Sequence, residues 1–197
     1  VQAVSILCLG EQLWVANSHA LPKEPDVLDL EIYQSPALPG VVPNCTTKVC
    51  QNDIKHYDDG SDLAFIRIRS IPPKSKILDL LARKSTDGVF SGVYLGRDIL
   101  GAPCVCPVFN IRASGNQVFP TDRNTLLTDN TWTCSSNVAN KIGDCGRVLV
   151  GNTPRGPIIL GIHCAGNFSD FNIALRLDFE MVQPIYNSNT LGFQACE

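Results

Sequence analysis

A cysteine placed between glycines is the first feature of the sequence that can carry chemistry. Cys145 stands in the stretch GDCG, residues 143–146, and a second stretch, GIHCAG, follows at residues 161–166. A cysteine on such a turn can project its sulfur into a cleft while the backbone N–H groups of the turn converge on one point. This suits an oxyanion hole made by Gly143 and Cys145. Gly143 permits the strained backbone of the turn, and Gly146 lets a substrate approach closely. The alternative is an ordinary turn with a buried cysteine.

A catalytic thiol at Cys145 needs a base, because a free cysteine with a pKa of about 8.5 is mostly protonated at neutral pH. An adjacent imidazole takes that proton or pairs with the thiolate. The chain has three histidines. His19 ends a strand-like run, LWVANSH, where it can face a cleft; His56 lies in the polar stretch NDIKHYDDG; and His163 lies one hairpin strand from Cys145.

A base of this kind benefits from a carboxylate that fixes its tautomer and stabilises the imidazolium. The stretch YDDGSDLAFIRI, residues 57–68, offers three aspartates. Asp62 directly precedes an alternating strand, so the strand sets its direction, and we prefer it. Asp59 is the second choice, and Glu31 is a further alternative.

Short apolar runs separated by turn residues dominate the chain and predict strands. Only SKILDLLARK, residues 75–84, has convincing helical spacing; a short helix near the C-terminus is expected to end before Pro184. Residues 110–119 are interpreted as a hairpin with its turn at ASGN, either a flap over a bound peptide or a plain surface hairpin. The other strand-like runs lie at residues 3–10, 12–21, 27–34, 62–71, 89–97, 104–113, 116–122, 130–136, 146–152 and 157–166.

Many short strands with polar turns predict an all-β fold, and a long connector between two sets of strands favours two barrels over one sandwich. We place the first barrel at residues 1–75, with the candidate histidine and aspartate. The connector is expected at residues 76–88. The second barrel, with the cysteine, is expected at residues 89–197.

Charge and composition narrow the class of function. The 197 residues carry a net charge of −3, are 44% hydrophobic and include nine cysteines. This balance does not favour a nucleic-acid binder, and no apolar run reaches the roughly 18 residues of a membrane span, so no membrane partner is expected. An odd cysteine count without a paired framework fits reduced thiols. We expect no secretory signal, since no charged-then-apolar leader is seen. The chain does not begin with Met and is expected to be shortened or cut from a longer precursor.

Two groups of cysteines raise the alternative of a zinc site. Cys45 and Cys50 could act with His56, and Cys104 could act with Cys106. Neither group has the paired C-x-x-C spacing of structural zinc sites. We therefore expect no metal and no cofactor.

The order His19, Asp62, Cys145 is that of chymotrypsin-like proteases, and with cysteine as nucleophile the chain resembles the 3C and 3C-like cysteine proteases of picornaviruses and their relatives. The resemblance rests on GDCG, on GIHCAGN and on the strand SDLAFIRI, and it covers most of the chain. It implies a double six-stranded antiparallel β-barrel, with the first barrel complete or shortened at its N-terminus. It also implies a cysteine endopeptidase that processes a viral polyprotein.

The resemblance also assigns a binding pocket. His163 would line the pocket for the residue before the scissile bond, where a neutral imidazole donates a hydrogen bond to the side-chain carbonyl of Gln or Glu. Asn140 stands where relatives often have threonine, and its amide would donate a hydrogen bond to the same side chain. Gly166 would lie along the peptide backbone, which pairs as an added strand. Ala165 departs from the usual second glycine of this motif.

The implied partners are a viral polyprotein and host-protein substrates in the cytoplasm of a host cell. Viral RNA is a further predicted partner, since the stretch at residues 67–84 lies where related proteases carry an RNA-binding motif. The alternative function is therefore an RNA-binding module on an inactive protease-like fold. The basic residues of this stretch are Arg67, Arg69, Lys74, Lys76, Arg83 and Lys84.

Overall fold

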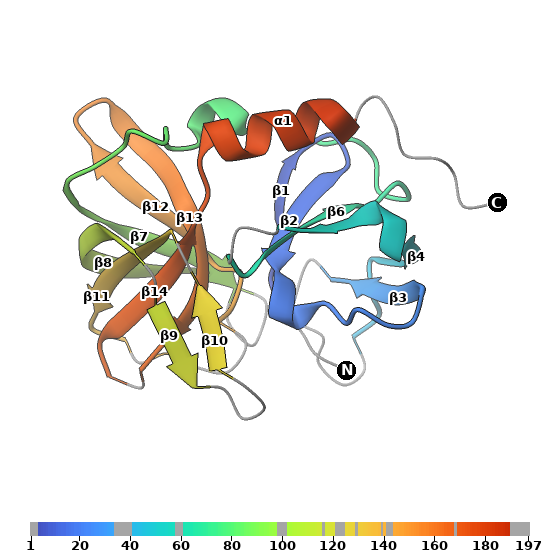
Figure 1. Ribbon diagram of the computed structural model, residues 1–197, viewed down its shortest axis with the longest axis horizontal. Coiled ribbons are helices and arrows are strands. Elements are labelled where there is room, and N and C mark those ends of the chain that lie inside the picture. The colour runs from blue at the N-terminus through green and yellow to red at the C-terminus, as the bar shows by residue number, and fades with distance from the viewer. Residues whose placement is uncertain are drawn as a thin grey trace.

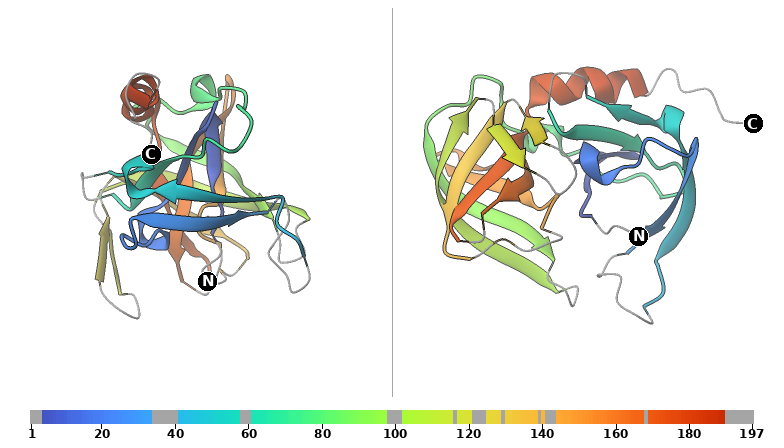
Figure 2. Two further views of the ribbon diagram at one scale, coloured as in Figure 1. Left: turned by 90° about the vertical axis from the view of Figure 1, so that its right-hand side faces the viewer. Right: turned by 60° about the horizontal axis from the view of Figure 1, so that its bottom comes forward.

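The computed structural model describes a mostly β molecule of two lobes, with one long helix across both (Figure 1). Figure 2, in its right-hand view, shows the same arrangement, with the helix again above both lobes. Among the residues that the structure describes, no helix combines the length and apolar character needed to cross a membrane. The described residues are 4–33, 41–57, 61–97, 102–115, 117–120, 125–128, 130–138, 140, 144–167 and 169–189.

Among its described residues, the N-terminal lobe contains six strands in two antiparallel sheets. One sheet has the order β1-β2-β6-β5 and the other pairs β3 with β4. The strands are β1 (Leu7–Gly10), β2 (Leu13–Asn17), β3 (Val27–Ile32), β4 (Cys45–Cys50), β5 (Ile54–His56) and β6 (Leu63–Arg67). Alternation places Leu28 and Val49 on the buried side of the β3–β4 pair, where they join Ala16 and Ile66 in one core. That shared core holds the two sheets together.

The C-terminal lobe is a closed barrel with the strand order β11-β14-β13-β12-β7-β8. Its strands are β7 (Val89–Arg97), β8 (Pro103–Ser114), β11 (Thr131–Ser136), β12 (Val148–Thr153), β13 (Gly156–Gly166) and β14 (Phe171–Arg176). Trp132, Leu149 and Leu160 are fully buried inside it. A closed six-stranded barrel beside a second antiparallel lobe confirms the all-β fold class expected from the sequence.

The hairpin predicted at residues 110–119 is wrong. β8 continues to Ser114 and pairs along its length with β7 and β11, because residues such as Ile111 are needed in the barrel core. The strand that follows, β9 (Gln117–Pro120), pairs instead with β10 (Thr125–Thr128) in a separate two-stranded sheet. This small sheet stands beside the barrel in Figure 1.

The helix predicted at residues 75–84 is also wrong. The segment contains one 3-10 turn, η3 (Leu78–Leu80), and then becomes extended. Ala82 N–H donates to the carbonyl of Ile159 at 2.8 Å, and Phe179 N–H donates to the carbonyl of Ala82 at 2.9 Å. Backbone pairing with β13 therefore replaces the hydrogen bonds that a helix would have made.

The C-terminal helix α1 (Phe179–Asn189) runs through Pro184, which was expected to end it. Asp178 caps its first turn by accepting a hydrogen bond from Met181 N–H at 2.8 Å. Proline removes one helical hydrogen bond, but Val182 and Ile185 are buried on the two sides of Pro184. Tertiary burial of this face outweighs the local preference of proline to end a helix.

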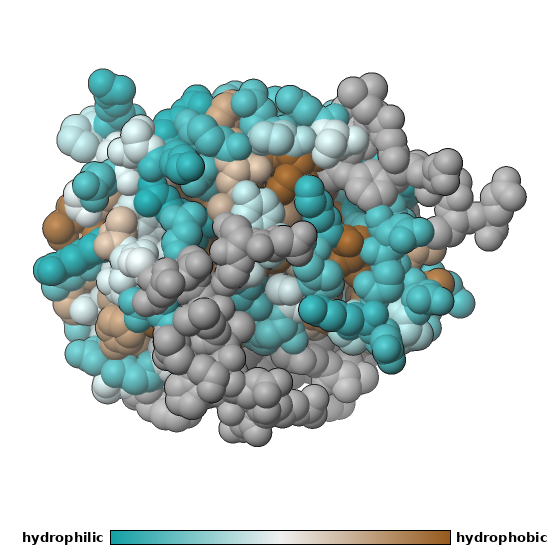
Figure 3. Space-filling model, in the orientation of Figure 1, coloured by the Kyte–Doolittle hydropathy of each residue, from teal (hydrophilic) through white to brown (hydrophobic). Residues whose placement is uncertain are grey.

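One hydrophobic core joins the two lobes. It contains Leu9 and Phe65 from the first sheet, Ile162 and Leu175 from the barrel, and Val182 from α1, all nearly or fully buried. The connector adds Leu78 and Leu81. Over the described residues of the face in Figure 3, hydrophilic side chains predominate and apolar ones form small separate patches. The core that the two lobes share is, by contrast, enclosed within the molecule.

Candidate active site

The imidazole and carboxylate of the site are brought together by the pairing of β2 with β6. Asn17, the last residue of β2, pairs with Leu63, the first of β6. His19 lies in the 3-10 turn η1 (Ser18–Ala20) that follows β2, and Asp62 immediately precedes β6. Ser18 N–H donates to the backbone carbonyl of Asp62 at 2.7 Å, which keeps the two segments in register.

Both carboxylate oxygens of Asp62 bind His19. Oδ2 lies 2.5 Å from His19 Nδ1, and Oδ1 accepts the backbone N–H of His19 at 2.7 Å. Asp62 is 4% exposed. Asn17 Nδ2 at 3.4 Å and the Cys164 thiol at 3.5 Å also donate to Oδ2. A buried carboxylate with this many donors fixes the orientation of the imidazole and leaves its Nε2 turned away from Asp62.

Cys145 approaches this pair from the barrel lobe. Its carbonyl accepts a hydrogen bond from Ser5 N–H at 3.2 Å, and its thiol donates to the carbonyl of Cys164 at 3.2 Å. The Cys145 side chain also contributes to the pKa of His19. Gly146, with φ +84°, has no room for a side chain, because a Cβ there would lie 1.9 Å from the carbonyl oxygen of Ser5. Glycine is therefore required directly after the thiol.

The surroundings of His19 raise its pKa from 6.5 to about 10. The largest cause is the hydrogen bond with Asp62, and the next is the hydrogen bond with the Cys145 side chain; partial burial acts in the opposite direction. At neutral pH the folded protein therefore favours the imidazolium form of His19. An imidazolium is the form of histidine that can stabilise a neighbouring thiolate.

The alternative acids and bases lie elsewhere. Asp59 and Gly143 fall outside the described residues. Glu31 is exposed on β3 and accepts a hydrogen bond from Tyr33 at 2.6 Å. His56 Nδ1 lies 2.6 Å from the hydroxyl of Ser18, the residue before His19. His56 is therefore near the site, but its ring is bonded to Ser18 and not to Asp62.

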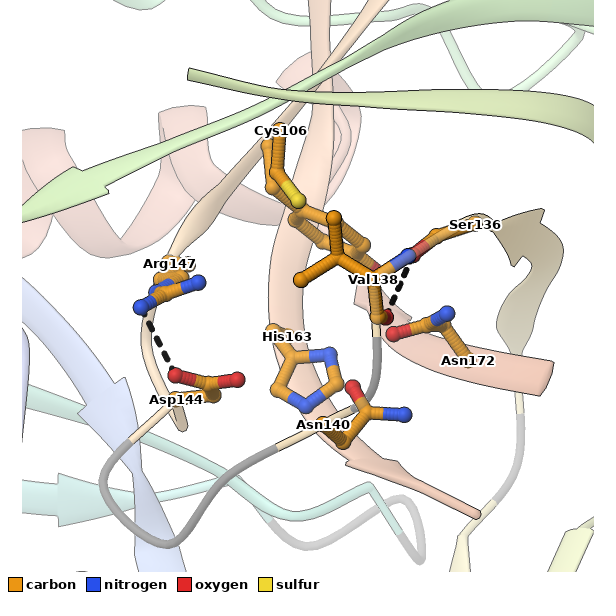
Figure 4. Close-up of a pocket in the computed structure, with 9 residues that line it drawn as sticks. Cys106, Ser136, Val138, Asn140, Asp144, Arg147, His163 and Asn172 are labelled. Carbon is orange, nitrogen blue, oxygen red and sulfur yellow. Dashed lines mark hydrogen bonds and ion pairs between the residues drawn. The ribbon is translucent and has the colours of Figure 1, made fainter. Parts of the chain in front are cut away.

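A small pocket that is partly open to solvent is lined in part by Asp144, the residue before Cys145 (Figure 4). Its lining residues are Tyr94, Cys106, Ser136, Val138, Asn140, Asp144, Arg147, His163 and Asn172. His163 is 3% exposed and meets the ring of Tyr94 edge to face, with ring centres 5.2 Å apart. Burial, and next the charge of Arg147, lower the pKa of His163 to about 4. The imidazole is therefore neutral at pH 7, and its Nδ1 has no hydrogen-bond partner among the described residues.

Asn140 is tied to the end of the barrel through its amide nitrogen. Nδ2 donates to the carbonyls of Asn167 at 2.6 Å and Phe171 at 3.2 Å. A Cβ at Gly166 would lie 2.2 Å from this nitrogen, so Gly166 makes room for Asn140. Both amide protons are occupied, which leaves the Asn140 oxygen, an acceptor, for a bound side chain. The sequence had suggested a donor at this position.

One group of three metal-ligand types is close enough to share an ion among the described residues: His19, Asp62 and Cys164, with ligand atoms within 4.8 Å of one another. Their mutual hydrogen bonds already account for this proximity. Neither zinc group considered from the sequence, at Cys45 or at Cys104, forms such a cluster in the described part of the chain.

The structure thus brings His19, Asp62 and Cys145 together and places His163 and Asn140 in an adjoining pocket. Sequence reasoning missed three contributors, Cys164, Asp144 and Arg147. Cys164 carries no motif signal, because its role depends on a contact between lobes. Asp144 and Arg147 could have been found, since opposite charges three residues apart can pair across a tight turn.

Neither a known protein family nor a curated protein sequence matches the chain. Solved structures do. The human rhinovirus C 3C protein with rupintrivir superposes with a TM-score of 0.61 at 14% identity, covering 89% of this chain and 86% of that one. An inactive mutant of the murine norovirus NS6 protease gives 0.55 at 14%, covering 87% and 91%. Tobacco etch virus protease complexed with product gives 0.57 at 17%, covering 95% and 74%. The chain has the chymotrypsin-like fold of these viral proteases, as the sequence had predicted.

Proposed function

We propose that the protein is a cysteine endopeptidase that cuts a viral polyprotein after Gln or Glu in the cytoplasm of a host cell. Cys145 is the nucleophile, His19 the base and Asp62 the residue that orients the base. The observation that carries the proposal is that groups from both lobes meet: Asp62 holds His19 through both carboxylate oxygens, and the Cys145 side chain of the barrel lobe helps to raise the pKa of the same imidazole. Three residues from distant parts of the chain thus meet as acyl transfer requires, with a nucleophile beside a base and the base beside a carboxylate.

In the first step, the Cys145 sulfur, whose proton His19 Nε2 takes or already holds, attacks the carbonyl carbon of the scissile peptide. The backbone N–H groups of Cys145 and Gly143 stabilise the resulting oxyanion. His19 then gives a proton to the leaving amine as the carbon–nitrogen bond breaks, which leaves a thioester. Water, deprotonated by His19, attacks the thioester and releases the acid. Asp62 stabilises the imidazolium in both halves of the reaction.

The pocket supports selection of Gln. The neutral imidazole of His163 can donate one hydrogen bond to a side-chain carbonyl, and the Asn140 oxygen can accept one from a side-chain NH₂. Gln supplies both groups. A side chain that lacks them would leave buried polar atoms unpaired, which costs strongly in binding. We expect His163→Ala to reduce the preference for Gln over Ala at this position in paired peptides.

The test is cleavage of a peptide with Gln before the scissile bond, followed by chromatography. Cys145→Ala should lower the rate by at least about a thousandfold while the chain stays folded. Cys45→Ala, which removes a thiol on β4 in the other lobe, should cut at the wild-type rate. Normal cleavage by Cys145→Ala would exclude this residue as the nucleophile.

RNA binding by the basic stretch stays a prediction. Arg69 pairs with Asp53 at 3.3 Å, Lys76 lies over the ring of Tyr186 at 5.0 Å, and Arg83 stacks on Phe179 at 3.8 Å. These contacts give three of the six cations a role within the protein. A salt-dependent affinity for an RNA stem-loop, reduced by Lys74→Ala, would support the RNA-binding alternative.

A further inference from the structure

Two opposite charges line the pocket beside the nucleophile. Arg147 Nη2 lies 2.8 Å from Asp144 Oδ1, and the two side chains are 16% and 10% exposed. Figure 4 shows the pair on one side of the His163 ring, with a dashed line between its members. The residues stand three apart on the turn that carries Cys145, before β12 begins. An ion pair this enclosed is screened little by salt. The charges of its two members therefore affect which side chain the pocket binds.

The position of Arg147 is built into the barrel. Its side chain lies over Gly96 of β7, where a Cβ would approach Arg147 Cγ to 2.7 Å and Cδ to 3.1 Å. Its backbone is also fixed, because its carbonyl accepts His163 N–H at 2.7 Å and its N–H donates to the Asp144 carbonyl at 3.2 Å. A side chain confined from both ends keeps its guanidinium against Asp144.

The charges in the pocket cancel. Among its lining residues, Asp144 and Arg147 are the charged pair, and the remainder are neutral at pH 7, including His163. The charge of Arg147 reaches the imidazole, since it contributes to the lowered pKa of His163. A guanidinium without its carboxylate partner would be a strong binding group for another carboxylate, because its fork of donors matches that geometry.

We propose that the Asp144–Arg147 ion pair makes the pocket select Gln over Glu. Asp144 cancels the one positive charge that would otherwise attract the carboxylate of a Glu side chain, and so leaves only the uncharged hydrogen-bonding groups to recognise the substrate. The inference rests on the proposed function, because it concerns the side chain that this same pocket binds.

The test compares two peptides that differ only in Gln or Glu before the scissile bond, and measures the ratio of their kcat/KM values. Asp144→Asn keeps the shape of the residue and frees the arginine charge, so the Gln to Glu ratio should fall by about tenfold or more. Arg147→Gln leaves Asp144 uncompensated and should raise the ratio. The double variant restores neutrality, and its ratio should return to within about threefold of wild type. Asp29→Asn, at an exposed ion pair with Lys48, should not change the ratio.

A ratio cancels any general loss of rate caused by changing the neighbour of Cys145. Unchanged ratios in both single variants, in an enzyme that cuts after Gln, would overturn this inference and leave the proposed function intact. If Asp144→Asn does not fold, Arg147→Gln decides, and an unchanged or lowered ratio contradicts the proposal. A wild-type chain that cuts neither peptide contradicts the proposed function and the inference together.

Discussion

The surroundings of the two histidines of the site shift their pKa values in opposite directions. His19 is about a third exposed and bonded to Asp62, and its pKa is raised to about 10. His163 is buried beside Tyr94 without an acidic partner, and its pKa is lowered to about 4. Histidine thus has two uses in this site: His19 is a charged group near the thiol, and His163 is a neutral hydrogen-bond donor in the pocket.

The raised pKa of His19 predicts a loss of stability at alkaline pH. Between pH 6.5 and about 10 the folded chain holds a proton that the unfolded chain has released, so the free energy of unfolding falls as pH rises. Urea unfolding across this window should show a steeper decline in wild type than in His19→Gln. Equal slopes would contradict the ion-paired state of His19.

The lowered pKa of His163 predicts a loss of stability at acid pH. As pH falls from 6.5 to about 4, the unfolded chain takes up a proton that the folded chain resists, which destabilises the fold by on the order of 3 kcal/mol. His163→Gln should be less sensitive to pH over this range in the same urea measurement. A matching acid dependence in both proteins would show that His163 is not held neutral.

At the scale of secondary-structure elements, two strand pairs position the residues of the site. The β2–β6 pair sets His19 beside Asp62, and the β12–β13 pair sets Cys145 beside His163 through the hydrogen bond from Gly146 N–H to the His163 carbonyl at 2.9 Å. Each pair carries one half of the site at its end. Small backbone changes at those ends are therefore expected to act on chemistry and stability together.

The turn after Cys145 gives a direct test of this positioning. Gly146→Ala adds a Cβ that would collide with the Ser5 carbonyl, whereas Gly156→Ala, also at positive φ, meets open space. Both substitutions incur backbone strain, so their difference isolates the collision. Gly146→Ala should be less stable than Gly156→Ala by about 2 kcal/mol or more, as measured by urea unfolding. Equal losses would mean that the turn can relax away from Ser5.

At the scale of the whole molecule, the lobes share one core, to which the connector and α1 both contribute. We expect the lobes to unfold together, because neither can separate without exposing this apolar surface. The two tryptophans report on different lobes, with Trp14 on β2 and Trp132 on β11. Fluorescence midpoints of Trp14→Phe and Trp132→Phe should each coincide with the circular dichroism midpoint of the same variant. Separate transitions would contradict a shared core.

The sequence predicted what local pattern determines. Two sets of short strands on either side of a connector predicted the two lobes, and the motif around Cys145 predicted the turn beside His163. Local pattern failed where tertiary contacts decide. Residues 75–84 have helical spacing, but the backbone of Ala82 pairs with Ile159 instead. Pro184 does not end α1, because the face around it is buried. The thiol of Cys164 reaches Asp62 only after the lobes have packed together.

The measurement that tests the account most directly is capture of the acyl-enzyme. A short peptide ester ending in Gln should transfer its acyl group to the wild-type chain and to Cys45→Ala, and intact-mass spectrometry with peptide mapping should locate the added mass on Cys145. Cys145→Ala should take up no such mass. An adduct that maps to another residue, or cleavage that persists in Cys145→Ala, would contradict the claim that this thiol, held against His19 and Asp62, performs the reaction.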